Sequence, residues 1–140
     1  MADMTNYLEE EILDFLFRNE AIFSIPTTVY VGLHTADPAE SGTAAGEVSG
    51  GAYVRKSVDG TGGTNWADPV GVGSTNNVGA ITFAQATAAW GTISHVSIWG
   101  TSSGGTTADV FLKGSLTADK PVASGDTFQF AAADLDISMA

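Results

Sequence analysis

Few side chains in this sequence have the chemistry to act as acids, bases or nucleophiles. Its histidines are His34 and His95, and it has no cysteine, which excludes disulfides and thiolate-bound metals. Serines and aspartates are plentiful, so a Ser-His-Asp set drawn from residue types alone carries no information. Both histidines fall in segments with strand-like alternation. We therefore expect two solvent-facing strand residues and a protein that is not an enzyme.

Two carboxylates, Asp134 and Asp136, lie two residues apart and therefore project from the same face of a strand. Such a pair could ligate a hard cation together with loop carbonyls, or could approach the separation of glycosidase carboxylates. No Asp-x-Asp-x-Asp-Gly loop accompanies them. We interpret them as part of a solvated polar face and expect neither a metal nor a cofactor.

Aromatic side chains could line a carbohydrate-binding surface. Trp99, Phe128 and Phe130 lie inside predicted strands and are expected in the core, whereas Trp66 lies in a polar, glycine-containing loop. An aromatic side chain in such a loop is typical of interfaces, which makes Trp66 a candidate interface residue. A carbohydrate-binding or glycan-active module is therefore an alternative function.

The chain is strongly acidic. Its 140 residues include 16 Asp and Glu against 5 Lys and Arg, a formal charge of -11. Binding to nucleic acid or to anionic membranes needs a surplus of basic side chains, so we expect neither partner. The acidic N-terminus differs from a signal peptide, and no apolar run approaches the roughly 20 residues that span a bilayer. We expect a soluble protein.

Residues 5–20 are predicted to form the one good helix, with Thr5 at its N-cap. Apolar side chains recur at helical spacing and form a stripe that is wide for a short helix. We expect the stripe to pack either on its own domain or against a second subunit. The candidate interface residues from this helix are Leu8, Ile12, Phe15 and Leu16.

From residue 27 onward the hydrophobic pattern has the period of two that is typical of strands. Long polar loops are predicted at 35–51 and 59–77. The fold class is therefore mainly β: an antiparallel β-sandwich or small barrel of about seven to eight strands over residues 27–140, preceded by one α-helix. One domain, residues 1–140, is the simplest organisation. Strands are predicted at 28–34, 52–58, 78–83, 93–99, 110–116, 127–131 and 135–139.

Several segments together resemble a family of small virion proteins of tailed bacteriophages. They include 4–9 (MTNYLE), 28–38 (TVYVGLHTADP), 46–53 (GEVSGGAY), 87–92 (TAAWGT) and 124–131 (SGDTFQFA). The resemblance covers nearly the whole chain and is weakest at 59–77 and 100–109. Members are described as capsid decoration proteins or as tail-fibre-like proteins, so the resemblance implies a structural role.

The resemblance implies most directly a capsid decoration, or cement, protein that binds and stabilises the outer shell as a small oligomer, with a trimer as the expected number. The alternative is a tail or tail-fibre component involved in tail assembly or host-surface contact. The implied partners are the major capsid protein or other virion proteins, and further copies of the chain. The implied location is the exterior of the virion, after assembly in the host cytoplasm.

Overall fold

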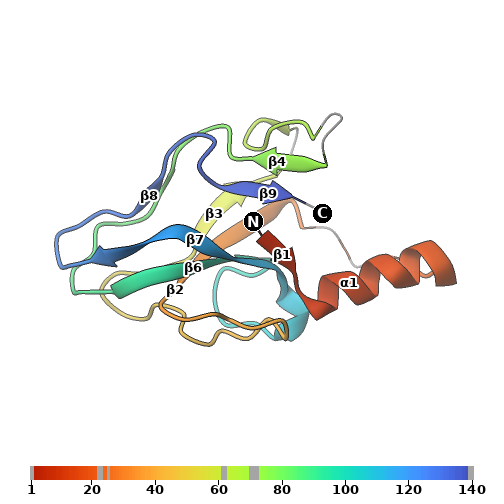
Figure 1. Cartoon of the computed structure of the whole chain (residues 1–140), viewed down its shortest axis with the longest axis horizontal. Helices are drawn as coiled ribbons and strands as arrows, with labels where there is room; N and C mark the ends of the chain where they lie inside the picture. The colour runs from red at the N-terminus through yellow and green to blue at the C-terminus, as the bar shows by residue number, and fades with distance from the viewer. Residues whose placement is uncertain (1, 22–23, 25, 61–62, 70–72, 139–140) are drawn as a thin grey trace.

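A computed structural model describes residues 2–21, 24, 26–60, 63–69 and 73–138. Its largest element is an antiparallel five-stranded sheet in the order β1-β7-β6-β2-β3 (Figure 1). Strands β6 and β7 are the longest and lie at the centre of the sheet. The five strands are β1 (Ala2–Met4), β2 (Thr28–His34), β3 (Lys56–Asp59), β6 (Gly91–Trp99) and β7 (Val110–Val122).

Two small antiparallel sheets complete the fold. Strand β4 (Ser74–Asn76) pairs with β9 (Asp136–Ser138), and β5 (Ile81–Thr82) pairs with β8 (Gln129–Phe130). Buried side chains from this region, such as Phe83 and Leu135, join those of the main sheet in one hydrophobic cluster. The mainly β prediction is confirmed. The described strands do not close into a barrel, because β1 and β3 lie at opposite edges of the main sheet.

Strand β2 matches its predicted range, 28–34, and shows how its alternating pattern builds the core. Val31 and Leu33 are fully buried opposite Ile98 and Val96 of β6. The opposite face of the strand is also buried, because the loop after β2 returns along it. Residues 47 and 48 pair with the end of β2, with the Val48 N–H donating to the Leu33 carbonyl at 3.0 Å. The Ala45 carbonyl contacts the His34 ring and Arg55 lies over Trp99 on that face, which was not predicted to be covered.

The boundaries of other strands differ from the predicted ones. The predicted strands at 52–58, 78–83, 127–131 and 135–139 are shorter, and Met139 lies outside the described residues. Strand β7 continues beyond residue 116. Strands β1 and β4 were not predicted, since three residues are too few to show an alternating pattern. The predicted loop 59–77 contains β4 and a bridge between Trp66 and Asn77.

The predicted helix at 5–20 divides into α1 (Asn6–Leu13) and a π-helical turn, η1 (Asp14–Arg18). Thr5 occupies the N-cap position, and its carbonyl accepts from the Glu9 N–H at 3.1 Å. The predicted side-chain cap is absent, because the Thr5 hydroxyl donates instead to the carbonyl of Val110 at 2.5 Å. Thr5 therefore ties the helix to β7.

Loss of this tie should destabilise the protein. Thr5 is fully buried, so Thr5→Val leaves the carbonyl of Val110 without its donor, and we expect a loss of about 1–3 kcal/mol in the free energy of unfolding. Urea denaturation measures the change. The control is Thr82→Val at an exposed position of β5, expected within about 0.5 kcal/mol of wild type. Equal effects of the two substitutions would contradict this role.

Candidate functional site

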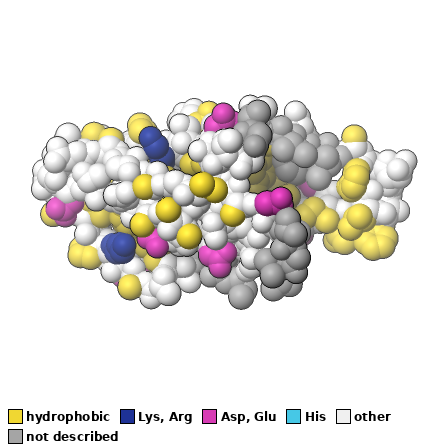
Figure 2. Space-filling model, turned by 90° about the horizontal axis from the view of Figure 1, so that it is seen from above, with side chains coloured by type: hydrophobic (Ala, Val, Ile, Leu, Met, Phe, Trp, Pro, Cys, Tyr) yellow, Lys and Arg dark blue, Asp and Glu magenta, His cyan; other side chains and the backbone are white. Residues whose placement is uncertain are grey.

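Among the described residues, the most exposed cluster of apolar side chains lies on the end of the N-terminal helix. We call residues 12–20 the arm. Leu13, Phe15, Leu16 and Phe17 are all more than half exposed, and Phe17 is 80% exposed. Figure 2 shows hydrophobic side chains gathered at the end of the molecule from which the helix projects. A cluster of exposed apolar side chains on a soluble protein marks an interaction site.

The base of the helix is fixed to the β-sheet, and its end is ordered by local contacts. The ring of Tyr7 stacks on Phe111 with centroids 6.4 Å apart. At the far end Arg18 pairs with Asp14 at 3.2 Å and with Glu20 at 2.6 Å. Asn19 ends the helix in the left-handed conformation, with φ of 54°. The arm is therefore a helical segment held out from the body.

The structure assigns different environments to the five candidate interface residues. Leu8 packs against the hydrophobic core of its own chain, and Ile12 is half-buried. Phe15 and Leu16 are exposed on the arm. Trp66 is half-buried and packs against the core. The exposed part of the predicted stripe is thus the arm, where Leu13 and Phe17 join Phe15 and Leu16.

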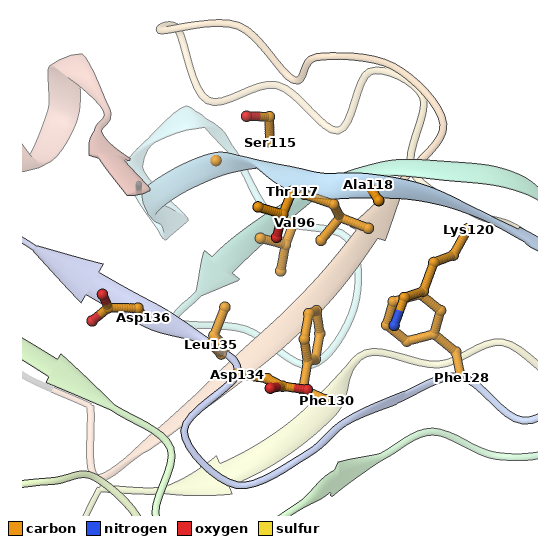
Figure 3. A pocket seen from close by; sticks show the side chains of 12 residues that line it. Val96, Ser115, Thr117, Ala118, Lys120, Phe128, Phe130, Asp134, Leu135 and Asp136 are labelled. Atoms are coloured by element: carbon orange, nitrogen blue, oxygen red, sulfur yellow. The ribbon is translucent and has the colours of Figure 1, made fainter.

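A second surface feature is a groove between β7 and the segment that carries β8 and β9. It encloses about 460 Å³ and is lined by Val96, residues 114–118, Lys120, Phe128, Phe130 and residues 134–136. The register of β6 against β7 shifts between Ile93, opposite Lys120, and His95, opposite Ser115, so β7 bulges between these positions. Figure 3 shows Phe128, Phe130 and Leu135 in a row below this part of β7.

Charged side chains lie at both ends of the groove. Figure 3 shows Lys120 beside Phe128 at one end and Asp136 at the other. The Nζ of Lys120 is 5.8 Å from the centroid of the Phe128 ring. Asp136 is exposed on β9. The groove therefore combines an apolar floor with one cation, Lys120, and two exposed carboxylates, Asp134 and Asp136.

The prediction that His34 faces solvent is wrong. His34 is fully buried, because residues 44–48 cover its side of the sheet. Its Nδ1 lies 2.9 Å from the carbonyl of Ala45 and must donate to it, so in the neutral ring Nε2 accepts from the Ser97 hydroxyl at 2.6 Å. Ser97 in turn accepts from the Trp99 indole N–H at 2.5 Å. Burial lowers the pKa of His34.

A buried ion pair lies next to this chain of hydrogen bonds, and sequence reasoning missed it. Arg55 donates to both carboxylate oxygens of Glu47, at 2.7 and 2.8 Å, and to the carbonyls of Thr101 and Gly104, each at 3.0 Å. Its guanidinium carbon lies 3.4 Å from the Trp99 ring centroid. In the sequence Arg55 follows Tyr53 and Val54 and precedes Lys56, and nothing in this segment indicates the partners of its charge.

Residues 100–104 (GTSSG) match the Gly-x-Ser-x-Gly motif of the nucleophile elbow in α/β-hydrolases. In the structure they form a loop after β6 that leads to a three-residue 3-10 helix (Thr107–Asp109), not a strand-to-helix elbow. The carbonyls of Thr101 and Gly104 serve as acceptors for Arg55. This arrangement gives the loop a structural part in holding the buried charge.

Asp134 and Asp136 are both exposed, and their settings differ. One carboxylate oxygen of Asp134 accepts from the Ala131 N–H at 2.9 Å and closes a turn. Within the described ranges, no three His, Asp or Glu side chains gather as metal ligands would. In the same part of the chain, no helix combines the length and apolar character needed to cross a membrane.

Comparison with known proteins gives a family match. A family model described as "Podophage GP4 fiber I protein gp80" matches residues 3–138 of the chain. No curated protein matches it. The family match confirms the resemblance to virion proteins of tailed bacteriophages.

Removal of the Arg55 charge should be costly, because Glu47 would remain in a largely buried site without its partner. Arg55→Met is expected to lower the free energy of unfolding by about 3–5 kcal/mol. The control is Lys56→Met, which removes an exposed charge one residue away and should change it by no more than about 0.5 kcal/mol. Similar denaturation midpoints for the two variants would show that the buried pair is dispensable.

Burial of neutral His34 should make stability fall in mild acid. Its folded-state pKa is lowered, so below about pH 6.5 the unfolded chain takes up a proton that the folded chain does not. This linkage contributes a slope of at most about 1.4 kcal/mol per pH unit. Urea denaturation between about pH 7.5 and 5.5 should show a smaller slope for His34→Gln than for wild type. Identical slopes in the two proteins would refute this expectation.

Proposed function

Because the chain belongs to the family described as podophage GP4 fiber I protein gp80, we propose that it is a subunit of a phage tail fibre. In this role it joins virion proteins by protein contacts, either to build the fibre or to attach it to the tail. The proposal depends on the match of this family model to residues 3–138 and on its description as a fibre protein.

The arm supports an assembly role. Its apolar side chains are exposed, whereas Phe128 and Phe130 elsewhere in the chain are buried in the core. Exposed apolar side chains promote aggregation, so their presence on an ordered helix favours a covered state in the assembled particle. We propose that the protein is a homo-oligomer, with a trimer as the expected number, and that its other partners are virion proteins.

The capsid decoration role is the alternative within the same class. An acidic exterior and a small β body suit a protein bound to the outer shell as well as one in a fibre. The partner would then be the major capsid protein, and binding to the assembled lattice alone would stabilise the shell. The family description favours the fibre over this role.

We also propose that the chain acts without catalysis, cofactor or metal, and without binding nucleic acid or membrane. The full burial of His34 and the turn-closing bond of Asp134 support a structural use of these groups. The charge of -11 supports a place on the exterior of the virion, away from the packaged DNA, after assembly in the host cytoplasm. A glycan-binding role for Trp66 would require its half-buried ring to be reachable.

The position of the protein in the particle tests the fibre proposal. We expect cryo-electron microscopy of the virion to show density for this β body in the tail fibres, at a copy number far below that of the shell lattice. Quantitative mass spectrometry of purified particles checks the copy number independently. Density spread over the outer shell, with a lattice-matched copy number, would contradict the fibre role and favour capsid decoration.

A further inference from the structure

The loop that follows β2 covers one face of the main sheet. We call residues 35–51 the strap, and all of its residues are described. Figure 1 shows it, in orange, reaching from the end of β2 toward the start of α1. Its charged side chains are Asp37, Glu40 and Glu47, with no lysine, arginine or histidine among them. The partners of these three carboxylates show how the strap is held.

The strap carboxylates pair with basic side chains of the body. The Nζ of Lys113, on β7, lies 3.3 Å from Oδ1 of Asp37 and 3.2 Å from Oε1 of Glu40. Arg55 pairs with Glu47 at 2.7 Å. The charges are thus divided between two parts of the chain, because the strap carries the acids and the body beneath it carries the bases.

Both histidines add to the basic side of this contact. His34 lies directly opposite His95 in the register of β2 and β6. The Nδ1 of His34 lies 2.9 Å from the carbonyl of Ala45 in the strap. The sequence has 5 Lys and Arg and 2 His, and of these Lys113, Arg55 and both histidines lie beneath or beside the strap. In an acidic chain this is a concentration of basic groups.

Two more ionisable groups lie next to the contact. Asp3 of β1 is opposite Lys113 in the sheet. The hydroxyl of Tyr53 donates to Glu47 at 3.1 Å, and burial raises the pKa of this phenol. Tyr53 therefore stays neutral in acid and at neutral pH.

The strap is held mainly by polar contacts. Its buried side chains are those of Pro38 and Val48, so it contributes little apolar surface to the core. A segment with few buried apolar contacts can open locally at a lower free energy than the whole fold. The Thr35 N–H donates to the Gly46 carbonyl at 2.8 Å, which closes the strap on itself. It is therefore built to move as one unit.

The strap also contacts the start of the helix that carries the arm. The N–H of Asn6, the first residue of α1, donates to the Glu40 carbonyl at 3.1 Å. A first-turn N–H has no partner within its own helix, so the strap satisfies it. Gly42 packs so closely that an added Cβ would lie 3.0 Å from Cβ of Val110 and 3.4 Å from Cγ2 of Thr5. The position of the strap thus affects the root of the arm.

Acid favours opening of the strap through two of these groups. Burial lowers the pKa of His34, so below about pH 6.5 the open form takes up a proton that the closed form does not. The Ala39 N–H and Lys113 hold the pKa of Asp37 below its usual value, so its protonation at lower pH acts in the same direction. Burial opposes the charge of Lys113, but its bonds to Glu40 and Asp37 outweigh this effect and raise its pKa. Lys113 stays charged throughout.

From this division of charge we propose that the strap is an electrostatic latch. Its three carboxylates hold it closed on the basic groups of the body at neutral pH, and it opens more often in mild acid while the main sheet stays folded. Opening uncovers His34 and withdraws the Glu40 carbonyl from Asn6, which loosens the hold on the arm. The latch is a property of the single chain and is independent of the fibre proposal. In the competing arrangement the strap opens only when the whole protein unfolds.

Amide hydrogen exchange of the full chain, followed by NMR, distinguishes the two arrangements. The N–H groups of Asn6 and Val48 fasten the strap to the body and report on its opening. At about pH 7.5 we expect their protection to be at least about a hundredfold lower than that of the amides of β6. After correction for the intrinsic exchange rate, it should fall a further tenfold or more by about pH 5.5. Equal protection of the strap and β6, or strap protection that does not change with pH, would overturn the proposal.

Removal of strap charges gives a second test at neutral pH. Asp37→Asn combined with Glu40→Gln takes both partners from Lys113 and should lower the protection of the strap amides about fivefold. Asp37→Asn keeps an oxygen that can accept from the Ala39 N–H.

The matched control is Asp119→Asn combined with Asp136→Asn, which removes two exposed carboxylates outside the strap. It changes the net charge equally and should leave the protection of the strap within about twofold of wild type. Circular dichroism melting verifies that both double variants fold. Equal protection of the strap in the two would show that its carboxylates do not hold it closed, which would overturn the latch.

Discussion

The positive charge of Arg55 lies inside the protein, and the loops around it are arranged to satisfy that charge. A buried guanidinium is tolerated only when it is paired and its donors are hydrogen-bonded. Glu47 supplies the opposite charge from the loop after β2, and the loop after β6 supplies two carbonyls. Segments far apart in the sequence are thereby held over one face of the main sheet. Because they cover that face, His34 and Ser97 must find their hydrogen-bond partners within the protein.

This constraint also explains which parts of the fold could be predicted from sequence. The alternation of Val31 and Leu33 predicted β2 and one face of the core correctly, since a strand with one buried face leaves a period of two. The same alternation placed His34 in solvent. Alternation separates the two faces of a strand, but it carries no information on whether a distant loop will cover the second face. The partners of Arg55 come from such loops.

The helix was predicted with its apolar stripe, but the sequence did not show which part of the stripe is buried and which part is exposed. Leu8 and Phe15 belong to the same pattern, yet the first packs against the core and the second is exposed. The difference arises from where the sheet ends, because Thr5 and Tyr7 hold only the start of the helix, on Val110 and Phe111 of β7. The groove could not be predicted, since it depends on a bulge in β7 and on the path of the chain between β8 and β9. The acidic charge of the chain offsets the aggregation risk of the exposed arm.

The central claim is that a folded β body carries an arm that is covered only on assembly. Amide hydrogen exchange tests this claim directly, by comparison of the dilute chain with the chain in the virion. We expect slower exchange in the virion at residues 12–20, with no change in β2 and β6, because the body is already folded before assembly. Equal exchange of the arm in both states, or new protection throughout β2 and β6, would contradict the account.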